Sequence, residues 1–381
     1  MTLFSESRLR TQRVLKIGLA LSLGYELICY LIWLAQPSTS PFADFFGLWS
    51  AGRFAAMAGG AVYDPVRLQE FQRLAETSFQ QELYYPCPYP PTILLVLAPL
   101  GLLPLGAAYV LWMVVTFTAY LWATLGRRCW SWSGVVLLAA PTTLLTMIAG
   151  QNGFLTAALL VGGLRSLGTA PIAGGVLLGL LSYKPQFGLL VPVALLAARQ
   201  GRAIAAAGLT VLACVAVSSA LFGWSIWRDW FDSLPLYQAL LKDNRPAFLH
   251  LMPTLAASIE ETTGSVLLAN SVQAAATLAV AILVWRCFAS SVERGIVPLL
   301  VGTVLATPYG FIYDMPMIAA AAVLEWQWRR SNALSITIWE TVLVVAFFEC
   351  TTIMSAHSLP FAATAALIAI LTRLIGVRAR V

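Results

Sequence analysis

Long apolar runs, separated by short turns that carry Lys and Arg, constrain the fold of this chain more than any other feature. The first of them, at residues 17–35, has the length that crosses the hydrocarbon core of a bilayer. Hydrophobic residues make up 59% of the chain and charged residues only 10%, whereas soluble domains carry about 25% charged residues. We therefore expect an all-α polytopic membrane protein whose single domain covers residues 1–381.

The distribution of basic residues predicts how the chain threads through the membrane. Arg8, Arg10, Arg13 and Lys16 precede the first run, which places the N-terminus in the cytoplasm. Because many further runs follow, we expect an uncleaved first helix and not a signal peptide. The net charge of +6 is then a topology signal and does not point to nucleic acid. Counting the runs gives about twelve spans with both termini inside. The later spans are expected at residues 106–125, 135–149, 154–164, 171–181, 187–198, 204–222, 266–285, 296–306, 316–325, 334–348 and 361–374.

Two polar segments are expected outside the cytoplasm. Residues 36–91 form a large first extracytoplasmic loop, in which residues 54–57 and 65–81 are predicted to be short surface helices. Residues 92–104 follow this loop, and because prolines bracket them and they are too short to span, we expect them to be half-inserted. Residues 223–263 form a second outer segment, whose tryptophans are predicted to belong to the interfacial aromatic belt.

An acidic residue stands in the first outer loop among aromatic side chains. Asp44 lies in the stretch Asp-Phe-Phe-Gly-Leu-Trp-Ser-Ala-Gly-Arg, which ends at Arg53. A carboxylate at the rim of a membrane costs free energy unless something uses its charge. The alternative is that Asp44 caps a short surface helix, since Asp is a common N-cap.

Other polar residues fall on the same outer side of the predicted topology. The inner turns carry almost only Arg and Lys, whereas the outer turns carry acids, amides, a lysine and tyrosines, which predicts a polar chamber on the non-cytoplasmic side. The outer groups are the proline-rich turn at residues 84–91, the pair Gln151-Asn152, the triplet Lys184-Pro185-Gln186 and the pair Tyr313-Asp314.

Each of these groups has a functional and a structural interpretation. Lys184 is suited to neutralise a departing phosphate, or it snorkels to lipid headgroups. Gln151 and Asn152 are suited to bind sugar hydroxyls, or they form a plain turn after a glycine. Tyr313 and Asp314 line the chamber, or they cap the helix that follows.

Several chemistries have no motif in the chain. There is no phosphate-binding loop, no dinucleotide fingerprint and no Asp-x-Asp pair. The six cysteines form no Cys-x-x-Cys pair, which argues against zinc, iron–sulfur or disulfide frameworks. We therefore expect no cofactor and no metal requirement, and an enzyme on this side of the membrane would use an activated substrate that is already linked to a lipid.

The ordered motifs of the chain resemble a known family. They are the Asp44–Arg53 stretch, Tyr63-Asp64-Pro65, Tyr89-Pro90-Pro91 with Ala98-Pro99-Leu100 and Leu103-Pro104, Gly150-Gln151-Asn152, Leu181-Ser182-Tyr183-Lys184-Pro185-Gln186, Thr307-Pro308-Tyr309 and Tyr313-Asp314. In this order they resemble the bacterial glycosyltransferase family 87, a branch of the GT-C membrane transferases that includes mycobacterial phosphatidylinositol-mannoside mannosyltransferases. The turn at residues 85–88, which doubles the Tyr-Pro motif, departs from the family pattern.

This resemblance implies a GT-C-like helix bundle and a reaction. A hexose, with mannose expected, would pass with inversion from a polyprenyl-phosphate donor to a lipid or glycan acceptor at the outer face of the bacterial cytoplasmic membrane. Asp44 takes the place of the catalytic base in the first loop, and the polyprenyl chain is expected near residues 92–104. The candidate residues for the donor phosphate and the substrate are Lys184, Gln186, Gln151, Asn152, Arg245, Tyr313, Asp314, Arg53 and Tyr89.

Two other functions fit a membrane protein of this composition. A transporter or flippase of lipid-linked sugars would carry inverted repeats and broken helices near the midplane, and no such repeat is visible. A ligase or polymerase of lipid-linked glycans would share the chamber and differ in its donor.

Overall fold

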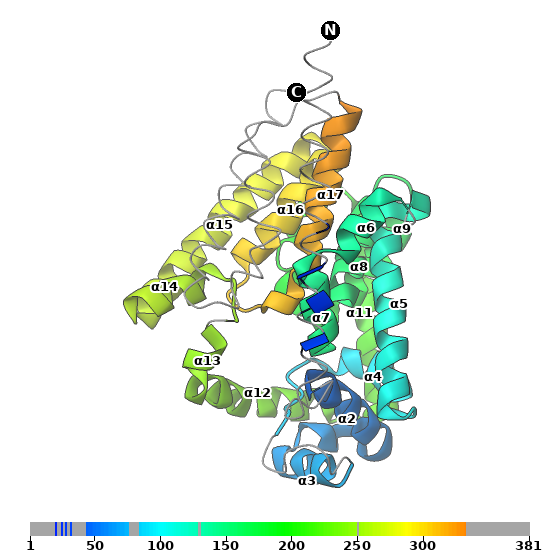
Figure 1. The fold of residues 1–381 in the computed structure, drawn as a ribbon, viewed down its shortest axis with the longest axis vertical. Coiled ribbons are helices and arrows are strands. Elements are labelled where there is room, and N and C mark those ends of the chain that lie inside the picture. Colours follow the sequence, from blue (N-terminus) through cyan, green and yellow to red (C-terminus); the bar gives the residue numbers. More distant parts are fainter. Residues whose placement is uncertain are drawn as a thin grey trace.

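The computed structural model describes residues 43–75, 84–128, 131–249 and 251–332, together with scattered residues between 20 and 32. Over these ranges the chain forms helices and connecting loops and no strand, which confirms the all-α prediction for this part (Figure 1). Most of the first expected span, and all of the two expected at residues 334–348 and 361–374, lie outside the described residues. The elements are α2 (Ala43–Ala58), η1 (Gly59–Tyr63), α3 (Pro65–Ala75), η2 (Pro91–Ile93), α4 (Leu94–Gly101), α5 (Leu105–Leu125), η3 (Gly126–Arg128), α6 (Trp132–Leu138), α7 (Pro141–Ala149), α8 (Gly153–Ser166), α9 (Pro171–Leu180), η4 (Leu181–Tyr183), η5 (Pro185–Gly188), α10 (Val191–Ala197), α11 (Gly201–Phe222), α12 (Ile226–Asp243), α13 (Arg245–Leu249), α14 (Leu255–Thr263), α15 (Val266–Ser290), α16 (Val292–Ala306), η6 (Ile312–Asp314) and α17 (Pro316–Ser331).

Among the described residues, three helices are long and apolar enough to cross a membrane. They are α5 with its following turn, α11 and α15, and the pair α6 and α7 makes a fourth if its two halves count as one span. That pair is bent by 51°, because Pro141 begins α7 and has no N–H with which to continue α6. The chain is thus a membrane protein, but the expected number of about twelve spans is not confirmed.

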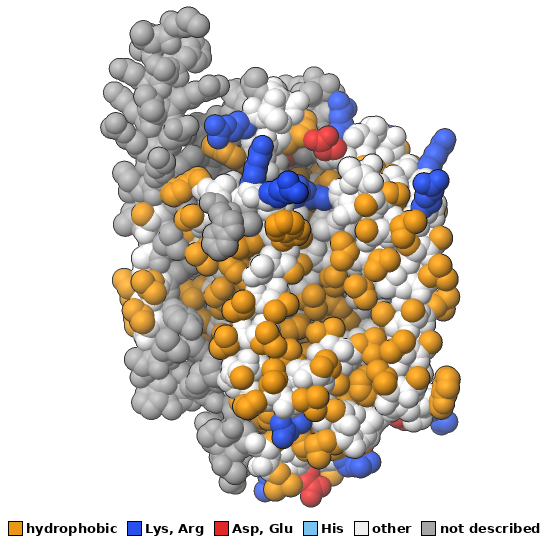
Figure 2. Space-filling model, turned by 90° about the vertical axis from the view of Figure 1, so that its right-hand side faces the viewer, with side chains coloured by type: hydrophobic (Ala, Val, Ile, Leu, Met, Phe, Trp, Pro, Cys, Tyr) orange, Lys and Arg blue, Asp and Glu red, His pale blue; other side chains and the backbone are white. Residues whose placement is uncertain are grey.

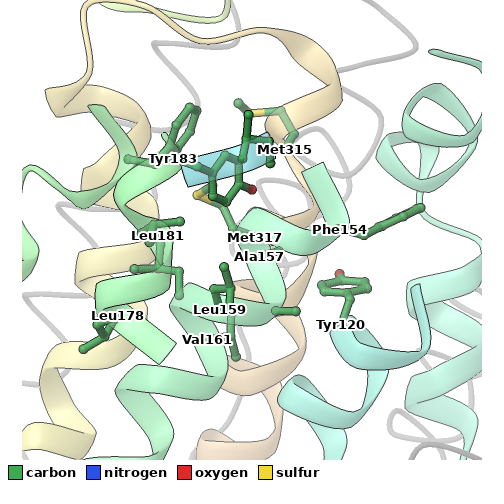
Figure 3. Close-up of a cluster of buried hydrophobic side chains, with 14 of the residues drawn as sticks. Tyr120, Phe154, Ala157, Leu159, Val161, Leu178, Leu181, Tyr183, Met315 and Met317 are labelled. Carbon is green, nitrogen blue, oxygen red and sulfur yellow. The ribbon is translucent and has the colours of Figure 1, made fainter. Parts of the chain in front are cut away.

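One of the shorter apolar helices, α8, lies in the interior of the bundle. Helix α8 is buried along most of its length and packs against α5, α9, α16 and α17. Figure 3 shows side chains of α8 between Tyr120 of α5 and Leu178 of α9. The rings of Tyr120 and Phe154 stack with centroids 5.7 Å apart. The buried face of α8 therefore packs against protein, where a lipid-facing span would meet acyl chains.

The two ends of the bundle differ in charge. Arg127 and Arg128 lie in η3, directly after α5. Arg165 lies in the last turn of α8 and donates a hydrogen bond of 2.6 Å to the carbonyl of Ala123. Figure 2 shows Lys and Arg side chains gathered at this upper end above a broad hydrophobic face, with a few charged side chains of both signs at the lower end. Helices α2, α3 and α12 lie at that lower end (Figure 1).

The segment predicted to form the first outer loop, residues 36–91, differs in detail from its prediction where the structure describes it. The helix expected at residues 54–57 is the last part of a longer helix, α2, and the second expected helix corresponds to α3. The segment predicted to be half-inserted forms η2 and α4, and α4 packs against α2. A Cβ atom on Gly52 would lie 2.1 Å from the carbonyl oxygen of Leu97, so only glycine permits this contact. Helix α4 is thus held against α2, and Leu94 and Leu97 are buried.

Candidate active site

A cavity of about 410 Å³ opens between α2, the proline-rich turn, the loop before α8, the η4–η5 turn, α12 and the loop at residues 309–314. This volume lies in the range of small-ligand pockets. The cavity brings together polar residues that are far apart in the sequence. The predicted site residues that line it are Asp44, Tyr89, Gln151, Lys184, Gln186, Tyr313 and Asp314.

Asp44 lies in the first turn of α2, where the partial positive charge of a helix N-terminus favours a carboxylate. Its Oδ2 accepts a hydrogen bond of 3.3 Å from Nε2 of Gln151. Burial raises the pKa of the Asp44 carboxyl, while the hydrogen bond from Gln151 lowers it. Asp64 is the residue that caps a helix here, since its Oδ1 accepts from the backbone N–H of Val66 at 3.0 Å. Asp44 is not the N-cap of α2, because it follows Ala43, the first residue of that helix. Its carboxylate accepts a hydrogen bond from a side chain that is distant in the sequence.

The turn after α7 places Gln151 against Asp44. Gly150 ends α7 with a φ of +67°, a left-handed conformation that favours glycine. A Cβ atom on Gly150 would also lie 2.5 Å from Cβ of Phe45. Gln151 accepts a hydrogen bond of 3.3 Å from the hydroxyl of Tyr89 on its Oε1. A hydrogen-bonded chain therefore runs from Tyr89 through Gln151 to Asp44.

Lys184 forms a buried ion pair with Asp314. Its Nζ lies 2.5 Å from Oδ1 of Asp314 and donates to Oδ1 of Asn152 at 2.8 Å. Only 3% of Lys184 and none of Asp314 is exposed. The other carboxylate oxygen of Asp314 accepts from the backbone N–H of Phe311 at 3.1 Å. The snorkelling alternative for Lys184 is therefore wrong, because the ammonium points into the protein.

Aromatic rings surround this ammonium group. Its Nζ lies 5.2 Å from the ring centroid of Phe187, 5.6 Å from that of Tyr313 and 5.8 Å from that of Tyr89, distances at which cation–π attraction acts. An ammonium has three N–H donors, and Asn152 and Asp314 take two. The third can serve a ligand in the cavity.

Two arginines predicted to bind substrate do not line the cavity. Arg245 donates hydrogen bonds to both carboxylate oxygens of Glu260 on α14. Arg53 donates to the carbonyl of Gly101 at 3.1 Å and lies over the ring of Trp49, so it joins α2 to α4. Because both guanidinium groups are engaged in these contacts, we no longer assign them to the donor phosphate.

Aromatic residues complete the cavity, and sequence reasoning missed those of α12. The sequence predicts Trp230 in the interfacial belt, whereas in the structure Trp230 lines the cavity and its Nε1 donates to the carbonyl of Pro88 at 3.1 Å. The hydroxyls of Tyr237 and Tyr309 hydrogen-bond each other at the cavity wall. The spacing of apolar residues at 230, 234, 237 and 241, typical of one face of a helix, is the signal that could have found this wall.

Side chains from three elements hold the proline-rich turn. Prolines have no N–H, so the turn makes few backbone bonds of its own. The amide of Gln72 on α3 donates to the carbonyl of Tyr85 at 2.8 Å and accepts from its N–H at 3.1 Å. The hydroxyl of Tyr63 donates to the carbonyl of Tyr89 at 2.9 Å. With the Trp230 bond, these contacts fix the turn that carries Tyr89 into the cavity.

Replacing Gln72 by Leu is expected to destabilise the protein. The side chain is 3% exposed, and Leu would leave both backbone groups of Tyr85 without their partner, at a cost of about 1–3 kcal/mol. Thermal unfolding in detergent micelles measures this, with Gln69→Leu on the same helix as the matched control. Equal melting of the two variants would contradict the role of Gln72.

No group of His, Cys, Asp and Glu side chains that could hold a metal ion is found within the described part of the chain.

In comparisons with known proteins, the family model described as glycosyltransferase family 87 matches residues 88–308, more than half of the chain. No curated protein and no solved structure matches the chain.

Proposed function

Because the chain belongs to glycosyltransferase family 87, we propose that the cavity is its active site and that its sugar donor is a polyprenyl-phosphate hexose, with mannose expected. The acceptor is the hydroxyl of a lipid or glycan. The observation that carries the proposal is the meeting of Asp44 and Lys184 in one cavity, from segments well separated in the sequence. One group can take a proton and the other can stabilise a phosphate.

In the proposed reaction, the acceptor oxygen attacks the anomeric carbon and its proton passes to the Asp44 carboxylate. The bond between the anomeric carbon and the phosphate oxygen breaks, and polyprenyl phosphate leaves with the bonding electron pair. Attack opposite the leaving group inverts the anomeric configuration. The third N–H of Lys184 stabilises the charge that develops on the departing phosphate.

Asp44 suits the role of base better than Asp314. The Asp314 carboxylate is already engaged on both oxygens, by the ammonium of Lys184 and by the backbone N–H of Phe311. Asp44 accepts from a neutral amide, and burial raises its pKa. A base with a higher pKa accepts a proton more readily near neutral pH.

The donor class follows from where the cavity lies. Gln151, which lines the cavity, precedes α8, whereas Arg165 lies in the last turn of α8, so the cavity lies away from the basic end of the bundle. By the positive-inside rule that basic end faces the cytoplasm, which supports a cavity at the outer face of the cytoplasmic membrane. Nucleotide sugars are made in the cytoplasm, whereas a lipid-linked sugar can reach this side within the bilayer.

The proposal is tested by incubating membranes that contain the protein with radiolabelled polyprenyl-phosphate hexoses. We expect label to appear in a lipid or glycan product, and membranes without the protein serve as the control. Equal product in both preparations would exclude this donor.

The outer-face location makes a separate labelling prediction. In a variant whose native cysteines are replaced by serine, Glu70→Cys on α3 should react with an impermeant maleimide on intact spheroplasts. Thr169→Cys, near Arg165 at the basic end, should react only after permeabilisation; both positions are exposed. The reversed pattern would place the cavity in the cytoplasm.

The hydrogen bond from Gln151 predicts a pH effect. The base works in its charged form, so kcat/KM should fall as the pH drops through the pKa of Asp44, which burial raises above the usual range of aspartate. Gln151→Leu removes a hydrogen bond that stabilises the Asp44 carboxylate, so the acidic limb of the kcat/KM–pH profile should move to higher pH. Gln186→Leu, another amide that lines the cavity, is the control. An unchanged limb in Gln151→Leu would show that Asp44 does not set it.

A further inference from the structure

Helix α12 presents two different faces. Its inner face lines the cavity with apolar and aromatic side chains that are only half-buried, namely Trp230, Leu234, Tyr237, Leu240 and Leu241. Its outer face carries charged side chains, with Arg228 84% exposed and Asp232 71% exposed. An amphipathic helix normally buries its apolar face completely against the protein core. Here that face remains open to the cavity.

The elements other than α12 supply a polar wall to the cavity. It carries Asp44, Gln151, Lys184, Gln186 and Asp314. A purely polar ligand would fill that side and leave the apolar face of α12 against water, which is unfavourable. The cavity therefore matches a ligand that is polar on one side and apolar on the other.

The location of α12 allows an apolar lipid chain to enter the cavity from the membrane. The membrane-spanning helix α11 ends at Phe222, and Gly223, with a φ of +107°, allows the chain to turn before α12 begins at Ile226. The start of α12 thus lies at the membrane surface. At 1.5 Å per residue, the face from Trp230 to Leu241 extends about 16 Å, the length of a few isoprene units.

We propose that the inner face of α12 binds the lipid chain of the donor, while its sugar phosphate lies on the polar wall. This inference rests on the proposed function, in which every donor carries an isoprenoid chain. Two contacts hold the face in place, the bond from Trp230 to the carbonyl of Pro88 and the bond between Tyr237 and Tyr309. Residues 92–104, near which the sequence predicts the polyprenyl chain, pack against α2 through α4 and do not line the cavity.

The test measures how strongly the purified protein binds polyprenyl phosphates of two chain lengths, without any sugar. We expect the wild type to bind a long chain more tightly than a chain of two isoprene units. Leu234→Ser combined with Leu241→Ser should lower the affinity for the long chain about tenfold and leave the short one unchanged. The matched control is Phe231→Ser combined with Leu236→Ser, which changes exposed positions of the same helix and should keep the wild-type preference.

The outcomes separate the inference from the proposed function. An unchanged preference for the long chain in the Leu234 and Leu241 variant would overturn the inference. If that variant binds neither ligand, Leu241→Trp provides the second test. The larger ring fills the far end of the face and should weaken binding of the long chain only. An unaltered preference for the long chain in Leu241→Trp would equally overturn the inference. A wild type that prefers long chains but transfers no sugar from them would refute the proposed function alone. In transfer assays, the loss of activity in the Leu234 and Leu241 variant could instead depend on the chain length of the acceptor. That result would assign the face to the acceptor and overturn the inference.

Discussion

Asp44→Asn is expected to lower the rate of sugar transfer about hundredfold or more, the contribution of a positioned general base. Asn keeps the shape of the side chain, and its carbonyl oxygen can still accept the hydrogen bond from Gln151. It cannot accept the proton of the acceptor hydroxyl. The protein should therefore insert, fold and bind the lipid donor normally while turnover falls. Transfer by the purified variant at equal expression measures the effect.

The controls distinguish a base from a structural carboxylate. Asp44→Glu should retain a little activity, because the base survives while its oxygens move, and positioning is costly to lose. Asp64→Asn changes a carboxylate that caps α3, and since Asn caps a helix as well as Asp, this variant should be nearly silent. Near-normal turnover in Asp44→Asn would remove Asp44 from the mechanism.

Lys184→Met is expected to cause the largest loss of stability. It leaves the buried Asp314 carboxylate without its partner, and breaking a buried pair costs about 3–5 kcal/mol at a site where neither side chain is more than 3% exposed. Denaturant unfolding in micelles measures this. Arg245→Met breaks a pair in which the arginine is 40% exposed, and it should cost less.

A double variant separates the two roles of Lys184. Lys184→Met combined with Asp314→Leu removes both charges, and such a replacement of a buried pair can be neutral for stability. We expect stability to recover while use of the polyprenyl-phosphate donor stays impaired, because the ammonium that would face the phosphate is gone. Recovery of both properties would show that the pair is only structural.

The positions of the cavity residues could be anticipated from the sequence to a useful degree. Positive-inside counting put Asp44, Gln151, Lys184 and Asp314 on one side of the membrane, and the structure places them around one cavity. Successive turns of a polytopic chain alternate between the two faces of the membrane. Residues at every second turn therefore share a face, however the helices pack. It could not predict which groups pair: the bond between Lys184 and Asp314 joins residues 130 positions apart.

Other features depend on tertiary contacts that hydropathy does not encode. Helix α8 is apolar because it is buried in the protein, and periodicity alone cannot distinguish such a helix from a lipid-facing span. Arg245 was assigned to the phosphate for its charge, and its pairing with Glu260 depends on how α13 lies on α14. The open apolar face of α12 likewise becomes evident only when its neighbours are in place.

The most direct test of the central claim is a comparison of donors with the purified protein in liposomes. Radiolabelled polyprenyl-phosphate mannose, the matching nucleotide sugar and a lipid-linked oligosaccharide are supplied in turn, with a bacterial lipid extract as the acceptor. We predict that label moves from the polyprenyl-phosphate donor and that Asp44→Asn lowers this transfer about hundredfold or more. Transfer only from the nucleotide sugar or the oligosaccharide, or transfer that Asp44→Asn leaves intact, would contradict the account.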